Sequence, residues 1–155
     1  MKQKLTLRFI SAAALCLALI FTSCTNFDSA WRKAATRKPS HDLSGRWEGR
    51  WISTRNGHNG ALRAIITPDG ANNFHALFHA TYGSVLTFTY PVMFETTRHG
   101  SSIEFCGTSD LPAWAGGRYT SNGHATYTDF TAIYKSKYDA GRFEMKRVAE
   151  QPAAH

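Results

Sequence analysis

Between residues 43 and 148, apolar and polar positions alternate one by one along the chain. The clearest stretch is residues 45–51, GRWEGRW, where glycine and tryptophan share one side of an extended chain and the charged residues share the other. Because successive side chains of a β-strand point to opposite faces, this spacing predicts a half-buried strand. A helical period of 3.6 residues does not compete with it, so the pattern predicts an all-β domain.

Seven further segments alternate in the same way, and turn signals such as residues 68–70 (PDG), 98–101 (RHGS) and 139–141 (DAG) separate them. The pair Asn122-Gly123 is a strong hairpin signal and is expected to end the sixth strand. Taken at every second position, the predicted apolar faces lie within residues 62–66, 74–82, 86–94, 103–107, 117–119, 128–134 and 143–147.

Eight short strands joined by tight turns predict a small antiparallel up-and-down barrel over residues 43–148. Closure of the sheet removes the unpaired edges that would otherwise favour aggregation. A β-sandwich is the alternative. An outer-membrane barrel fits less well, because its outer face would be a lipid-compatible apolar band, whereas full charges alternate along the polar face here.

The N-terminus has the pattern of a targeting segment. Lys2, Lys4 and Arg8 precede the apolar run of residues 9–21, which is shorter than the ~20 apolar residues that span a bilayer. Residues 1–23 are therefore predicted to be a cleaved signal peptide. Residues 24–42 follow as a short, flexible, cation-bearing tether in which residues 29–37 form at most a short helix, and residues 149–155 are expected to be a disordered tail.

Residues 21–24, FTSC, resemble the lipobox of bacterial lipoproteins. The resemblance implies that Cys24 is acylated, for example with palmitate, and becomes the mature N-terminus. It further implies a membrane-anchored protein of the bacterial cell envelope, facing the periplasm from the outer membrane if the host has two membranes. An ordinary cleaved signal peptide is the alternative, and Cys16 is a weaker rival because it follows Leu15 within the apolar run.

Composition narrows the picture further. The 155 residues are 43% hydrophobic and include 18 Lys and Arg against 11 Asp and Glu, which describes one small globular domain. Three of those cations lie in the predicted signal peptide and four in the tether, and the cations of the barrel domain do not cluster, so a nucleic-acid partner is not expected. With Cys16 removed and Cys24 acylated, Cys106 is left alone and no intramolecular disulfide is expected.

Gly45-x-Trp47 in the first strand, together with an arginine near the end of the last strand, resembles the signature of the calycins, the lipocalin-like barrels that bind apolar ligands. The resemblance implies that Arg142 or Arg147 covers Trp47 across the closed end of the barrel through a cation–π contact. The longer pattern over residues 45–63 also resembles small bacterial lipoproteins, and that resemblance implies no activity.

Candidate chemistry is sparse. On a strand, His75 and His79 would lie about 13 Å apart, too far to share one metal ion, and both are expected on the solvent face. His58, His99 and His124 adjoin glycines in expected turns. We therefore expect no catalytic residues, no metal, no cofactor and no enzymatic activity.

Two functions remain. In the first, aromatic side chains fill the barrel, and the protein is a non-catalytic structural or interaction module whose partners are membrane lipid and an envelope protein. In the second, the barrel holds a small apolar or amphipathic ligand that enters through a mouth formed by turns that include residues 56–60 and 98–101. The candidate lining residues are Trp47, Trp51, Phe74, Phe78, Phe88, Tyr90, Phe130 and Tyr134.

Overall fold

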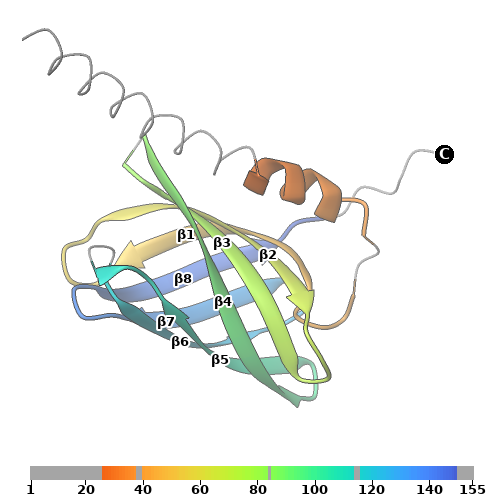
Figure 1. Ribbon diagram of the computed structural model, residues 1–155. Coiled ribbons are helices and arrows are strands. Elements are labelled where there is room, and N and C mark those ends of the chain that lie inside the picture. The colour runs from red at the N-terminus through yellow and green to blue at the C-terminus, as the bar shows by residue number, and fades with distance from the viewer. Residues whose placement is uncertain (1–25, 38–39, 84, 114–115, 150–155) are drawn as a thin grey trace, which may run out of the picture.

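The computed structural model describes residues 26–37, 40–83, 85–113 and 116–149. They form a closed barrel in which each strand pairs antiparallel with the next and β1 pairs with β8 (Figure 1). The predicted eight-stranded up-and-down barrel is thus confirmed, whereas the signal peptide and Cys24 lie outside the described residues. The strands are β1 (Gly45–Ser53), β2 (Asn59–Pro68), β3 (Asn73–Tyr82), β4 (Leu86–His99), β5 (Ser102–Asp110), β6 (Arg118–Ala125), β7 (Asp129–Lys135) and β8 (Ala140–Arg147).

The hairpin predicted at Asn122-Gly123 is wrong, because both residues lie inside β6. Gly123 pairs with Phe105 on one side and with Ala132 on the other. A Cβ atom at position 123 would lie 2.7 Å from the Phe105 ring and 2.2 Å from the Thr131 carbonyl oxygen. The glycine therefore serves a close approach inside the sheet rather than a turn.

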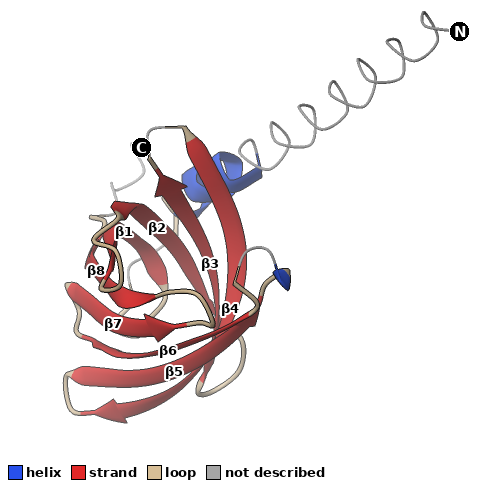
Figure 2. Cartoon of the chain, turned by 90° about the vertical axis from the view of Figure 1, so that its left-hand side faces the viewer, coloured by secondary structure: helices blue, strands red, loops and turns tan. Residues whose placement is uncertain are grey.

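The β3–β4 hairpin projects beyond the rest of the sheet (Figure 2). β4 pairs with β3 from Leu86 onward but with β5 only from Met93 onward. Leu86 and Phe88 were expected on the buried face, yet they are 65% and 43% exposed. Alternation sets the face of each side chain, but burial also needs neighbouring strands, and this part of β4 is not paired with β5.

The turns divide between the two ends of the barrel. The Trp47 end holds the turns after β2, β4 and β6, and the Tyr82 end holds the turns after β1, β3, β5 and β7. The turns at residues 56–60 and 98–101 therefore lie at opposite ends and cannot form one mouth, which corrects the expectation from the sequence. In an up-and-down barrel, successive turns alternate ends.

Residues 26–34 form a helix on the outside of the barrel instead of a free tether. Phe27 and Ala34 are 1% and 2% exposed and form a small cluster with Ile65 of β2, while Leu77 of β3 packs against its edge. Asp28 accepts a hydrogen bond from Arg63 at 3.2 Å. This satellite core fixes the helix against β2 and β3.

The helix also changes the surroundings of His79, which is 7% exposed instead of solvated as expected. The Phe27 ring stacks on the imidazole with ring centroids 4.5 Å apart. His79 Nδ1 shares a hydrogen bond of 2.8 Å with the Thr89 hydroxyl. The outer face of β3 is therefore a second buried surface at this point.

Candidate functional site

The middle of the barrel is filled by aromatic rings. The Phe78 ring of β3 lies 5.4 Å from Tyr90, 6.1 Å from Phe94, 6.5 Å from Phe130 and 5.6 Å from Phe143, measured between ring centroids. These partners come from β4, β7 and β8. Such a cluster stabilises the fold through burial and through edge-to-face and offset contacts.

Two more of the candidate lining residues, Trp47 and Phe74, lie next to this cluster, near the starts of β1 and β3. The Trp47 ring packs on Phe130 at 5.6 Å and is fully buried, and Phe74 is 5% exposed. Like Phe78 and Phe130, they contribute to a packed core.

Arg147 covers the Trp47 end. Its guanidinium carbon lies 4.2 Å from the centre of the Trp47 ring and 5.2 Å from that of Tyr127. The same group donates hydrogen bonds to the backbone carbonyls of Asp42, Ser44 and Tyr127. One side chain therefore links the segment before β1 and the turn after β6 to the core at the Trp47 end.

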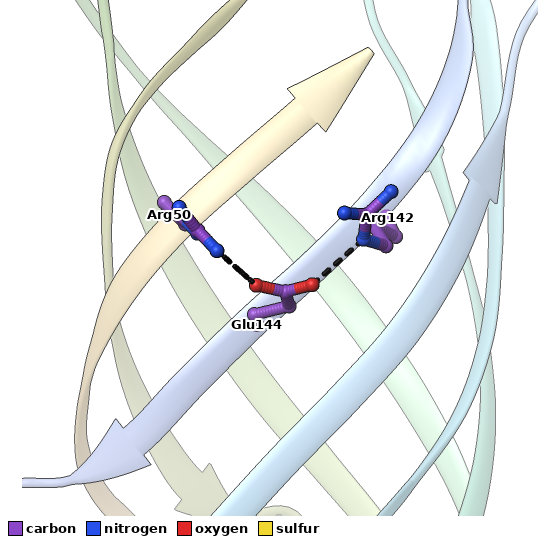
Figure 3. A network of polar contacts seen from close by, with 3 residues as sticks. All are labelled: Arg50, Arg142 and Glu144. Atoms are coloured by element: carbon purple, nitrogen blue, oxygen red, sulfur yellow. Dashed lines mark hydrogen bonds and ion pairs between the residues drawn. The ribbon is translucent and has the colours of Figure 1, made fainter. Parts of the chain in front are cut away.

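Arg142, the alternative arginine, lies on the outer face and towards the other end of the barrel. Its register partners in the neighbouring strands are Ile52 of β1 and Ile133 of β7. Figure 3 shows Glu144 accepting hydrogen bonds from Arg142 at 2.7 Å and from Arg50 at 2.9 Å. These two arginines hold the pKa of the Glu144 carboxyl below its usual range. Arg142 thus belongs to a surface ion-pair network, and Arg147 is the arginine over Trp47.

A cleft of about 270 Å³ lies beside Arg147, outside the closed end. It is bounded by Arg37 and Ser44 on one side, by Ile66 and Pro68 of β2, and by Val148 after β8. The Arg147 guanidinium in the wall of this cleft donates to the three carbonyls named above.

The Tyr82 end has a different arrangement. The Trp51 indole donates a hydrogen bond of 2.9 Å to the Thr81 carbonyl, and its ring stacks on Tyr82 at 5.6 Å. The Tyr82 hydroxyl shares a hydrogen bond of 2.6 Å with Nδ1 of His58. Gly60 makes this possible, because a Cβ there would lie 2.7 Å from the Trp51 indole nitrogen.

Asp139 organises the opposite side of the same end. One carboxylate oxygen accepts a hydrogen bond from Ser53 at 2.6 Å, and the other accepts one from the Tyr134 hydroxyl at 2.8 Å. Burial and the hydrogen bond to Asp139 raise the pKa of Tyr134. In the sequence Asp139 is recognisable only as a turn residue, since the five-residue separation from Tyr134 is no motif by itself.

Phe88 forms the rim of this end. It is 43% exposed and stacks on the buried Tyr90, with ring centroids 5.4 Å apart. Burial raises the pKa of Tyr90 above its usual range. Of the candidate lining residues, the ones that reach the Tyr82 end are Trp51, Phe88, Tyr90 and Tyr134.

Other chemistry is limited in the part of the chain that the structure describes. No group of three or more His, Cys, Asp and Glu residues there lies close enough to hold a metal ion. Cys106 is exposed on the outer face of β5. None of the helices over the described ranges is long and apolar enough to cross a membrane.

Comparison with known proteins bears on the fold. No protein-family model and no curated protein matches the sequence. A redesigned β-barrel, mFAP1, solved bound to DFHBI, superposes with a TM-score of 0.51 at 13% sequence identity, over 68% of this chain and 94% of that one. A fluorescence-activating β-barrel designed de novo gives a TM-score of 0.49 at 15% identity, over 69% and 94% of the two chains. The first of these superpositions shows that the chain is similar in fold to a small designed β-barrel.

Proposed function

We propose that this protein is a membrane-anchored lipoprotein of the bacterial cell envelope, acylated at Cys24, whose barrel is a non-catalytic structural or interaction module. The observation that carries the second part is the packing around Phe78, where rings from β4, β7 and β8 surround the central side chain. An interior filled by its own aromatic side chains serves stability. The module then acts through its outer surfaces and ends.

The anchor is tested by replacing the predicted acylation site. In Cys24→Ala, the protein should leave the membrane fraction, because the acyl chains supply most of the affinity for the bilayer. Cys106→Ala is the matched control, since this exposed cysteine lies on the barrel and its loss should leave the protein in the membrane fraction. Retention of Cys24→Ala in the membrane fraction would refute the anchor.

The alternative function is binding of a small apolar or amphipathic ligand at the Tyr82 end. It is favoured by one observation, namely that Phe88 lies on the inner face of β4, stacks on Tyr90 and is nevertheless 43% exposed. A partly exposed aromatic wall at a barrel mouth is typical of a ligand site. Such a site would extend outward from the packed middle and not through it.

Tryptophan fluorescence distinguishes the two functions. The mature protein is titrated with fatty acids, isoprenoids and peptidoglycan fragments, and Trp51 at the Tyr82 end acts as the reporter. A saturable change that is lost in Phe88→Ala and retained in Ile133→Ala, on the exposed outer face of β7, would establish the ligand function. No response to any of them favours the packed module, and hydrolysis of a substrate that depends on His58 would refute both.

A further inference from the structure

Exposed apolar side chains gather at the Tyr82 end. Val85 is 87% exposed and Leu86 is 65% exposed, and both lie at the tip of the projecting β3–β4 hairpin. Tyr82 and Phe88 beside them are each more than two-fifths exposed, and Tyr138, in the turn after β7, is 58% exposed. Large apolar side chains are rarely left in water in such a group unless they contact a partner.

Cations accompany these side chains. Arg55, in the turn after β1, and Lys137, in the turn after β7, are both exposed. The Lys137 ammonium lies 5.2 Å from the centre of the Tyr138 ring. Asp139, the acid in the same turn, is already hydrogen-bonded to Ser53 and Tyr134. Apolar side chains rimmed by cations match the surface of an anionic bilayer.

The helix of residues 26–34 begins towards this end. Phe27 stacks on His79, whereas Trp31 lies over Arg46, whose β2 partner is Ile65. Arg46 is nearer than His79 to the Trp47 end, so the helix starts on the side of the hairpin tip, as Figure 1 shows. The first described residues of the chain therefore lie on the side of the Tyr82 end.

The lengths involved are short. Cys24 and Phe27 are three residues apart, at most ~10 Å of extended chain. Along β3, the distance from His79, under Phe27, to Tyr82 at the strand end is also about 10 Å. A bilayer that takes up an acyl chain on Cys24 thus lies within reach of the hairpin tip.

We propose that the Tyr82 end docks on the lipid bilayer, with the tip side chains of Val85, Leu86 and Phe88 inserted at the headgroup level and Arg55 and Lys137 next to lipid phosphates. This inference rests on the proposed anchorage at Cys24. It gives the barrel a fixed orientation on the membrane, in which the Trp47 end and its turns point away from the bilayer. The end directed away is then the one that meets other envelope components.

The test measures the depth of two labelled positions in the acylated full-length mature protein. In a Cys106→Ser background, a fluorophore is attached at Val85→Cys or at Ser101→Cys, the latter in the turn after β4 at the Trp47 end. The protein is reconstituted into vesicles of phosphatidylethanolamine and phosphatidylglycerol that carry a nitroxide-labelled phospholipid. The label at position 85 should be quenched and the label at position 101 should not.

A second pair of variants tests the apolar contact. Adding Leu86→Asp should reduce the quenching at position 85 to the level seen at position 101, because a carboxylate does not enter the apolar layer. Ile133→Asp places the same charge on an exposed apolar residue of the outer face and should leave the quenching unchanged. Equal quenching at positions 85 and 101, or no effect of Leu86→Asp, would overturn the docking.

Failure of the anchor has a separate signature. If Cys24 is not acylated, the protein does not enter the membrane fraction and its free thiol takes up a second label, which refutes the proposed function and the docking together. If the protein is anchored but position 85 is unquenched, only the docking fails. A lipid-free dimer that Leu86→Asp converts to a monomer would identify a second copy, instead of the bilayer, as the partner.

Discussion

The two ends of the barrel are built from the same alternating strands but are finished differently. At the Trp47 end, Arg147 reaches across the last ring of the core and donates to three backbone carbonyls, so the inner face is sealed by the chain itself. At the Tyr82 end, β3 and β4 continue into a hairpin in which β4 is not yet paired with β5. A packed core and a cap from β8, which is far from Trp47 in the sequence but pairs with β1, stabilise the first end, whereas the second leaves its aromatic residues for another contact.

Replacing an aromatic residue at each end should give the largest difference between the ends in the free energy of unfolding. Trp47→Ala should lower the free energy of unfolding by about 3–5 kcal/mol, since the ring is fully buried and its loss leaves a cavity. Tyr82→Ala should cost much less, because this ring is 42% exposed. Urea denaturation of both variants measures the comparison, and equal losses would contradict it.

The cap itself should have the next largest effect. Arg147→Ala removes a cation–π contact and leaves three carbonyls without this donor, which should cost about 1–3 kcal/mol. Arg142→Ala is the matched control in the same strand, because it breaks only a solvent-screened surface ion pair and should cost much less. If the two variants unfold at the same denaturant concentration, Arg147 does not close the barrel.

The contact between His79 and the helix that starts on the side of the Tyr82 end should make the stability of the protein depend on pH. Burial, followed by the nearby Arg63, lowers the pKa of His79 from its usual 6.5. The unfolded chain therefore binds this proton at a higher pH than the folded chain, and stability should fall as the pH drops below about 6.5. The stability that is fully present above this pH should be lost progressively as the pH approaches the lower folded value.

His79→Phe isolates this effect, because it keeps a ring against Phe27 but cannot titrate. Between about pH 7.5 and 5, a range that spans the usual histidine pKa, the wild type should lose more stability than the variant in parallel urea denaturation series. An identical pH dependence of the two proteins would show that His79 does not contribute.

The smallest effect on stability is expected at the hairpin tip. Leu86→Ser should change the free energy of unfolding by no more than about 0.5 kcal/mol, since the side chain is 65% exposed and packs little in the folded chain. Thermal denaturation in the absence of lipid measures this. A loss as large as that of Arg147→Ala would mean that the tip is structural, which would weaken its assignment to the membrane.

The packing of the helix of residues 26–34 on the barrel had a signal in the sequence, but the strand pattern obscured it. Phe27, Ala30, Trp31 and Ala34 follow the spacing of one helix face, and Ile65 interrupts the alternation of β2 by adding an apolar residue to its outer face. Each half of this contact is too short to be interpreted alone. Together they indicate a helix on an apolar patch, which the cations of residues 32–38 and the nearby Pro39 made look like a tether.

The class and connectivity of the fold follow from the order of residues alone, because an alternation of period two fixes which side chains share a face, and short turns force neighbouring strands to pair. The same alternation places Trp47 and Phe78 on the inner face. Two properties needed the folded chain, namely which arginine covers Trp47 and which inner-face residues are exposed. The choice of arginine depends on contacts between residues far apart in the sequence, since the partners of Arg147 are as many as 105 residues away. The exposure of Leu86 and Phe88 depends on how far neighbouring strands pair, because β5 pairs with β4 only from Met93 onward.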